Sequence, residues 1–417
     1  MIAQTRLPNR WFIALAGTGL QLCLGTVYAW SYFQKPLVEA YGWSNSQVAW
    51  TFSLAICFLG LAAAWGGLQL SRLGPRRLAV TGGLLFGLGH LVAALALHLH
   101  SLALLYFGYG VLAGCGLGLG YVTPVATVAK WFPDKKGLAT GMVIMGFGFG
   151  ALLMSKVFAP LLYRVSGGNL VMVFAWLGMG FLPVVAGLGT LLRNPPGKAP
   201  SNDPINHPTG VPFVSAILPD LLSRRFLIIW FVFFSNILAG ISLISFQSPL
   251  FQSVWSHRDP TLSKEVLASC GATLIAVSSL FNGFGRILWG AASDRLGRSR
   301  TFQIMLASQI AVFAALTRTG DPWLFGVLVC YVLLCYGGGF GSMPSLVHDT
   351  FGAAKMPILY GAILTAWSAA GIFGPQWVAF LNDHHATRLA PYAFGSSAIV
   401  LALGFALSLA LPKPQDA

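Results

Sequence analysis

The sequence predicts an all-α membrane protein whose twelve transmembrane helices are arranged in two six-helix halves. Three observations support this fold class: the composition, the number of long apolar stretches, and one polar stretch that divides them six and six. Of the 417 residues, 56% are hydrophobic and only 9% are charged, whereas a soluble domain carries about 25% charged residues. Most of the surface therefore faces lipid and not water.

Twelve stretches are long enough to cross the hydrocarbon core, which takes about 20 apolar residues. The first begins near Trp11 and has no small-residue cleavage site, so we expect a retained helix and not a signal peptide. The predicted spans are 11–35, 46–70, 78–98, 102–128, 138–162, 169–192, 226–251, 268–292, 301–317, 323–347, 357–381 and 390–411.

The polar stretch between the sixth and seventh spans reads RNPPGKAPSNDPINHPTGVP, residues 193–212. Its Pro, Gly, Asn and Ser content is typical of a flexible linker. We therefore predict an N-terminal six-helix bundle at 1–192, a cytoplasmic linker at 193–225 and a C-terminal six-helix bundle at 226–417.

The basic residues predict the orientation, because cytoplasmic loops are enriched in Lys and Arg. This asymmetry accounts for the net charge of +14 without a nucleic-acid partner. We expect a multi-pass, monomeric protein of the inner or plasma membrane with both termini in the cytoplasm. Seventeen basic residues fall on the predicted inner side: Arg6, Arg10, Arg72, Arg76, Arg77, Lys130, Lys135, Lys136, Arg193, Lys198, Arg224, Arg225, Arg295, Arg298, Arg300, Lys355 and Lys413. Six fall on the outer side: Lys35, Arg164, Arg258, Lys264, Arg318 and Arg388.

An enzyme would need a nucleophile, an acid/base pair or a metal cluster within the spans. The predicted spans contain no Asp or Glu, and His90 has no acidic or Cys/His partner nearby in the sequence. The six cysteines lie in apolar segments without disulfide or CxxC spacing, so we interpret them as core residues. We expect no enzymatic activity, no cofactor and no metal site. A transporter-like sensor would carry an added soluble domain, for which the linker and tail are short.

A short motif occurs once in each half, after the second helix. GLQLSRLGPRR begins at Gly67 and GAASDRLGRSR begins at Gly290, which are 223 positions apart. The second copy resembles the G-x-x-x-D-R-x-G-R pattern of the major facilitator superfamily, and the first has Ser71 in place of Asp. Two unrelated basic turns are the alternative. The resemblance implies two halves that rock around a binding site at the membrane midplane.

Apart from Lys35 at the outer end of the first span, only Lys156 and Arg286 place a formal charge inside a predicted span. Lys156 is twenty residues beyond Lys136, roughly 30 Å along a helix, so its ammonium can reach the far interface. Arg286 is eight residues from Asp294, about 12 Å deep and near the midplane. Arg286 therefore needs an explanation that Lys156 does not.

A cation at the centre of a membrane helix costs on the order of 3 kcal/mol, and Arg stays protonated. The spans offer no carboxylate to Arg286, so its partner is either backbone carbonyls and water or an anionic cargo held by the guanidinium. Asn282 lies four residues earlier on the same face and offers a further donor. Tyr121, Phe147 and Tyr336 lie at similar depths, about 13, 16 and 18 Å by helix rise, and either line a central cavity or pack as core residues. The two phenols favour the cavity, since each needs a hydrogen-bond partner.

Four segments resemble the oxalate:formate antiporters and the related monocarboxylate transporters: NRWF at 9–12, YAW at 28–30, KWFPDKKGLATG at 130–141 and FNGFGR at 281–286. The resemblance implies that Arg286 matches an Arg that binds a carboxylate in the oxalate carriers. A second cation of those carriers, a Lys on the eleventh helix, corresponds to Trp367. The family's aromatic cage corresponds to Tyr28, Tyr121, Phe147 in place of a Tyr, Tyr336 and Phe340. Val27 and Leu364 stand where a Gln and a Trp are expected.

One cation in a more apolar lining suits an anion with one carboxylate, such as lactate or pyruvate. The resemblance implies proton symport, but animal monocarboxylate carriers place an acid at the position of Asn282. An empty carrier with an unpaired Arg286 would instead favour exchange of anions, as in an oxalate:formate-like exchanger. His257 and Asp259 are the closest titratable candidates for a proton carrier, with ordinary loop residues as the alternative.

Overall fold

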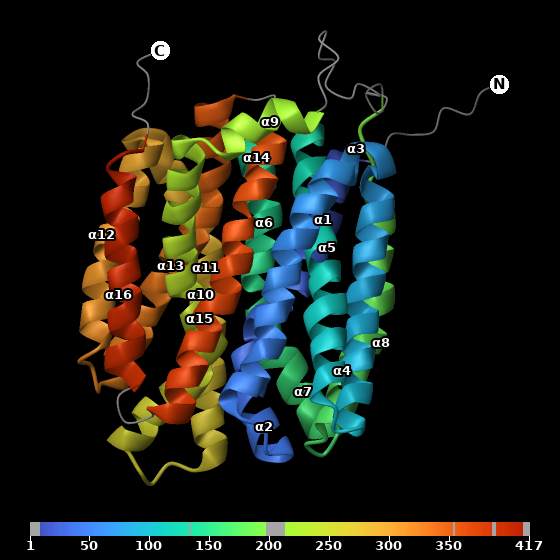
Figure 1. The fold of residues 1–417 in the computed structure, drawn as a ribbon. Coiled ribbons are helices and arrows are strands. Elements are labelled where there is room, and N and C mark those ends of the chain that lie inside the picture. The colour runs from blue at the N-terminus through green and yellow to red at the C-terminus, as the bar shows by residue number, and fades with distance from the viewer. Residues whose placement is uncertain are drawn as a thin grey trace, which may run out of the picture.

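A computed structural model describes residues 9–132, 134, 136–196, 213–352, 355–385 and 389–411. Arg6, Lys135, Lys198, Arg388 and Lys413, which entered the orientation argument, lie outside the described residues. Within them, twelve helices are long and apolar enough to cross a membrane, and no strand occurs. The predicted all-α membrane fold is confirmed (Figure 1).

The first six spans are built from eleven helical segments: α1 (Arg10–Leu24), η1 (Gly25–Ala29), α2 (Trp30–Tyr41), α3 (Asn45–His98), α4 (Leu102–Leu105), η2 (Tyr106–Ala113), α5 (Gly114–Trp131), α6 (Lys136–Leu153), η3 (Met154–Phe158), α7 (Ala159–Val165) and α8 (Leu170–Leu191). The second six follow a short helix: α9 (Phe213–Leu221), α10 (Arg224–Arg258), α11 (Lys264–Leu296), α12 (Arg298–Leu316), α13 (Pro322–Phe351), α14 (Met356–Ile363), α15 (Thr365–His384) and α16 (Leu389–Ser408).

Several helices extend beyond the apolar stretches that predict them. The seventh span, expected at 226–251, is the 35-residue helix α10, Arg224–Arg258. Polar residues at its ends do not interrupt it, since an α-helix satisfies its own backbone in water and lipid alike. Helix α9 lies inside the segment 193–225 predicted as linker, and its Pro219 falls within the helix.

The internal repeat has a counterpart in the backbone. Gly74 and Gly297 have φ angles of 75° and 86°, the left-handed region that favours glycine. Gly74 breaks α3 into the second and third spans, and Gly297 separates α11 from α12. The two glycines are 223 positions apart (297 − 74), as are the two motifs. Both copies therefore turn the chain in the same way.

Successive spans run in opposite directions, so the loops between them lie alternately at one end of the bundle and at the other. The linker end holds Arg10, where α1 begins, and α9, which lies across the helices at the top of Figure 1. At this end Arg10 pairs with Asp134 at 2.8 Å, and Lys355 pairs with Asp220 at 2.6 Å. The opposite end holds the turn at 42–44 between α2 and α3. That the linker end, and not the opposite end, faces the cytoplasm stays a prediction from the distribution of basic residues.

The two halves are hydrogen-bonded to each other at the opposite end. Both carboxylate oxygens of Asp383, at the end of α15, accept hydrogen bonds from the start of α3. The donors are the backbone N–H and side chain of Asn45 and the backbone N–H and hydroxyl of Ser46, at 2.7–3.0 Å. Lys35 on α2 donates to Gln252 on α10 at 3.3 Å. These contacts hold the halves together on that side of the bundle.

Candidate functional site

A close crossing of α11 and α13 sets the position of Arg286 and Asn282. Gly337 and Gly341 on α13 face α11, and a Cβ on either would collide with the carbonyl oxygen of Asn282 or Arg286, respectively. Small residues four apart allow two membrane helices to approach this closely. The crossing carries the backbone of both predicted site residues against α13, where Tyr336 and Phe340 also lie.

The Arg286 side chain is buried, with 3% of the residue exposed. Its Nε, Nη1 and Nη2 atoms have no hydrogen-bond partner among the described residues, and it forms no ion pair with any of them. Instead, its guanidinium lies 5.1 Å from the ring centre of Phe340 and 5.9 Å from that of Phe147. A ring face attracts a cation but satisfies none of its five N–H donors.

Six aromatic residues form one buried cluster beside Arg286, three from each half of the chain. Trp367 is at its centre, with ring centres 4.6 Å from Phe340, 5.4 Å from Tyr121, 6.2 Å from Phe147 and 6.5 Å from Tyr28. Most of these pairs are edge-to-face, the geometry that the ring quadrupoles favour. The cluster consists of Tyr28, Tyr121, Phe147, Tyr336, Phe340 and Trp367. Seven of the eight predicted site residues, Arg286 and the six rings, therefore lie together between the halves, and Asn282 is buried one helical turn before Arg286 on α11.

Several polar atoms of this region lack a protein partner. The Tyr121 hydroxyl, the Asn282 Oδ1 atom and the Trp367 Nε1 atom are buried without a hydrogen bond to a described residue. The Tyr121 carbonyl accepts from Gln21 Nε2 at 2.9 Å, so the neighbouring backbone is held while the phenol stays unpaired. Buried polar groups are normally hydrogen-bonded. The Tyr121 hydroxyl and the Trp367 Nε1–H can donate to an anion beside Arg286, whereas the Asn282 Oδ1 atom accepts and suits a hydroxyl of the ligand.

Tyr360 on α14 belongs to the same region and was missed from the sequence. The Tyr121 hydroxyl is within electrostatic range of both Tyr360 and Arg286, although neither makes a hydrogen bond to it with acceptable geometry. Tyr360 precedes Trp367 by seven residues, two helical turns, which places both on one face of a regular helix. The seven-residue spacing from Trp367 could therefore have identified Tyr360 from the sequence.

Other charged and titratable residues weighed from the sequence lie outside the cluster. Lys156 is exposed and donates to Thr273 at 2.6 Å, and its reach to the membrane interface stays a prediction. His90 is buried among aromatic rings, and its Nδ1 contacts the Phe86 carbonyl at 2.8 Å. At the opposite end, His257 is exposed and Asp259 is partly exposed, and their side chains contact only nearby residues.

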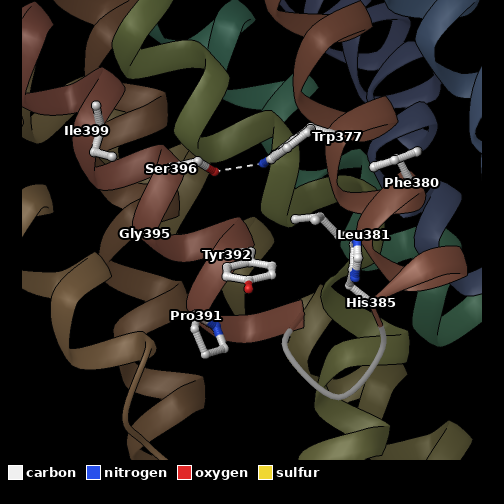
Figure 2. Close-up of a pocket in the computed structure, with 9 residues that line it drawn as sticks. All are labelled: Trp377, Phe380, Leu381, His385, Pro391, Tyr392, Gly395, Ser396 and Ile399. Atoms are coloured by element: carbon white, nitrogen blue, oxygen red, sulfur yellow. Dashed lines mark hydrogen bonds between the residues drawn. The ribbon is translucent and has the colours of Figure 1, made fainter.

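Within the part of the chain that the structure describes, neither a metal centre nor an apolar groove offers an alternative to the site around Arg286. Among the described residues, no three His, Cys, Asp or Glu side chains are grouped to hold a metal ion. A pocket of about 500 Å³ lies between α15 and α16, where Trp377 donates to Ser396 at 2.8 Å (Figure 2). Its lining includes Phe380 and Ile399, 43% and 64% exposed, and none of the aromatic cluster. We interpret it as a lipid-facing groove.

Comparison with known families decides the class of this bundle. The family model described as Major Facilitator Superfamily matches residues 13–375. The chain belongs to the Major Facilitator Superfamily. It is therefore a multi-pass membrane transporter and not an enzyme, and the resemblance first seen at Gly67 and Gly290 is confirmed.

Relatives within the superfamily include carriers of organic acids. The chain is 28% identical to the oxalate:formate antiporter of Oxalobacter formigenes over 88% of this chain and 84% of that protein. It is 24% identical to human monocarboxylate transporter 11 over 97% of this chain and 83% of that protein. Among solved structures, a D-xylose–proton symporter superposes with a TM-score of 0.70 at 15% identity, covering 97% of this chain and 98% of that one. This last similarity concerns the fold.

Proposed function

We propose that this superfamily member transports small monocarboxylates of the lactate and pyruvate type by alternating access, coupled to protons. Arg286 is the carboxylate-binding residue, and Asn282, Tyr121 and Tyr336 orient the rest of the anion. Tyr28, Phe147, Phe340 and Trp367 form the aromatic lining. The names of two relatives, an oxalate:formate antiporter and a monocarboxylate transporter, support an organic anion as cargo.

The observation that carries the proposal is the state of Arg286. A permanently charged guanidinium, 3% exposed, has three nitrogens without a partner among the described residues. Leaving a buried charge unpaired costs several kcal/mol. A carboxylate can accept two parallel N–H bonds from the planar guanidinium, an interaction stronger and more directional than a neutral hydrogen bond. An anionic cargo therefore supplies the negative charge and the hydrogen-bond acceptors that the described residues do not offer to Arg286.

The aromatic lining supports a single carboxylate. Arg286 is the one cation in contact with the six-ring cluster among the described residues. Trp367, at the position of the second cation in the oxalate carriers, is fully buried against the rings. A second carboxylate would lie among these rings without a counter-charge, which is unfavourable in a medium of low dielectric constant. A short apolar body such as a methyl group suits that surface better.

Proton coupling rests on the resemblance to monocarboxylate carriers, and the site gives a reason to weigh anion exchange against it. No carboxylic acid pairs with Arg286 among the described residues, so an empty carrier has to change conformation with a bare buried cation. A loaded carrier has the charge neutralised. This difference favours exchange of one anion for another, the second candidate function.

Counterflow in proteoliposomes tests both candidate mechanisms, proton symport and anion exchange. Vesicles loaded with unlabelled lactate should accumulate labelled lactate, and pyruvate should compete better than oxalate. Accumulation driven by an inward proton gradient in vesicles without internal anion supports symport, and uptake only with internal anion supports exchange. Preference for oxalate over lactate would contradict the monocarboxylate assignment. Arg164→Lys provides a matched control for Arg286 variants, because Arg164 is exposed and lies on α7, which contributes no residue to the aromatic cluster.

A further inference from the structure

A second polar cavity lies at the linker end, apart from the aromatic cluster. It has a volume of about 480 Å³ and lies where the turn between α9 and α10 meets the α13–α14 junction. Helices α10 and α13 begin and end membrane spans there, so the cavity is at the depth of lipid headgroups. It is lined by Asp220, Ser223, Arg224, Arg225, Thr350, Phe351 and Lys355.

The charges around this cavity are unbalanced. Lys355 Nζ is 2.6 Å from Asp220 Oδ2, so that pair is neutral. Arg224 and Arg225 are exposed and form no ion pair or side-chain hydrogen bond with another described residue. The lining therefore has an excess of two positive charges.

The position of these arginines on α10 goes against local helix electrostatics. They occupy the first turn, which contains no acidic residue, although the positive end of the helix dipole disfavours cations there. Ser223 caps the helix by accepting from the Phe226 N–H at 3.2 Å, so the cap gives no reason for two arginines. An anion in the cavity would relieve both the charge excess and the dipole conflict.

Apolar side chains beside the cavity indicate the source of that anion. Leu218 on α9 is 47% exposed and Leu222, in the turn, is 70% exposed, while Ile217 is buried against the bundle. Helix α9 thus packs on the bundle through Ile217 and, less completely, Leu221, and leucines beside it are exposed at headgroup depth, the arrangement of an interfacial helix. Cations next to exposed apolar groups match a phospholipid, which carries a phosphate and acyl chains in one molecule.

We propose that this cavity binds the phosphate of an anionic phospholipid. Arg224 and Arg225 contact the phosphate oxygens, and Leu218 and Leu222 contact the acyl chains. The bound lipid joins α9 and α10 to the α13–α14 junction, five residues before Tyr360 in the sequence. The proposal is independent of which anion the transporter carries.

Thermal unfolding of the purified full-length protein in neutral detergent tests the proposal. The probes are phosphatidylglycerol, phosphatidylcholine and inorganic phosphate, each added in steps. Phosphatidylglycerol should raise the melting temperature of the wild type more than phosphatidylcholine does. In Arg224→Gln/Arg225→Gln, the concentration for half of this rise should increase by at least about tenfold, since two charge-assisted contacts are lost.

Arg76→Gln/Arg77→Gln is the matched control, because these residues are also consecutive, exposed arginines at the linker end but do not line the cavity. It should keep the wild-type response. Equal loss in both double variants, or no loss in the cavity variant, would overturn the proposal. An equal rise with inorganic phosphate would overturn the lipid as ligand. If the double variant does not fold, Arg225→Gln is compared with the wild type by native mass spectrometry, in which it should retain less phosphatidylglycerol; equal retention would also overturn the proposal.

Discussion

The hydroxyl groups of Tyr28 and Tyr336 lie 2.8 Å apart, although 308 positions separate the two residues in the chain. Tyr28 is in η1 of the first half and Tyr336 is in α13 of the second. Both are buried, and their ring centres are 5.8 Å apart in an edge-to-face arrangement. The hydrogen bond therefore joins the halves beside Arg286, and separation of the halves at this level has to break it.

Tyr28→Phe and Tyr336→Phe should each raise the apparent substrate constant by about fivefold, since one neutral hydrogen bond contributes about 1 kcal/mol. The double variant should be little worse than either single one, because both remove the same bond. Substrate constants from proteoliposome uptake check this. Two single effects that add in full would mean that each phenol acts separately.

Tyr121→Phe differs from those two variants, because the Tyr121 hydroxyl has no hydrogen-bond partner among the described residues and its removal breaks no bond between them. We expect a rise in the substrate constant of similar size, caused by loss of a bond to the cargo. Wild-type kinetics in all three single variants would assign these tyrosines to packing.

Arg286→Lys should lower lactate transport by a factor on the order of 10 to 100 while the protein stays folded, because lysine keeps the charge but loses the planar, bidentate fork. The control Arg164→Lys changes an exposed arginine in α7 and should transport normally. Size-exclusion profiles of both variants verify folding. Wild-type transport by Arg286→Lys would refute the carboxylate-binding role.

The sequence predicts the spans from apolar length, and it predicts Arg286, Asn282, Tyr121, Phe147 and Tyr336 from their spacing along the predicted helices. Tyr28, Phe340 and Trp367 come only from the resemblance to the oxalate:formate antiporters. Arg286 stands out since nothing local can neutralise it. The bond between Tyr28 and Tyr336 has no such signal, because it depends on how two halves meet. Tyr360 was missed because it lies only five residues from Lys355, about 8 Å by helix rise, which is shallower than the residues nominated by depth. Helix α9 was missed because its nine residues lie among turn-forming residues.

Asp383→Asn should weaken closure at the opposite end, because the carboxylate accepts four hydrogen bonds from the start of α3, and an amide has only one acceptor oxygen. The readout is labelling of Ser53→Cys by a membrane-impermeant maleimide, in a background with the six native cysteines replaced. Ser53 is buried where α3 meets α15 and contacts Gln376. Labelling should be faster in Asp383→Asn.

Asp321→Asn serves as the control for this effect. Asp321 also accepts from a helix start, the Leu324 N–H at 2.8 Å, but within its own half of the chain. Its substitution should leave the labelling rate of Ser53→Cys unchanged. Equal rates in all three proteins would mean that Asp383 does not hold the halves together.

Asp259→Asn should leave the pH dependence of lactate accumulation unchanged. Hydrogen bonds from the hydroxyl and backbone N–H of Thr261 hold the pKa of the Asp259 carboxyl below its ordinary value of 3.8. A lowered pKa favours the folded state above the ordinary value, and this contribution is lost only as the pH falls through the lowered one. The group therefore stays ionised from pH 5 to 8. A changed response to a proton gradient would contradict this expectation.

Trp367→Lys tests why the site prefers one carboxylate. The substitution places a second cation among rings that Arg286 already contacts, and like charges repel strongly in a medium of low dielectric constant. Lactate neutralises one of them and oxalate both, so lactate transport should fall while oxalate becomes a better competitor relative to lactate. Burial can also remove the new lysine's proton, since it lowers the pKa of an amine, and then the preference should return toward lactate as the pH rises. The measurement is competition by oxalate and by formate against labelled lactate, in variant and parent, with Trp377→Lys on the lipid-facing side of α15 as control. If Trp367→Lys still transports lactate with an unchanged oxalate-to-lactate ratio, Trp367 does not face the cargo, and the absence of a second cation is no reason to prefer a monocarboxylate.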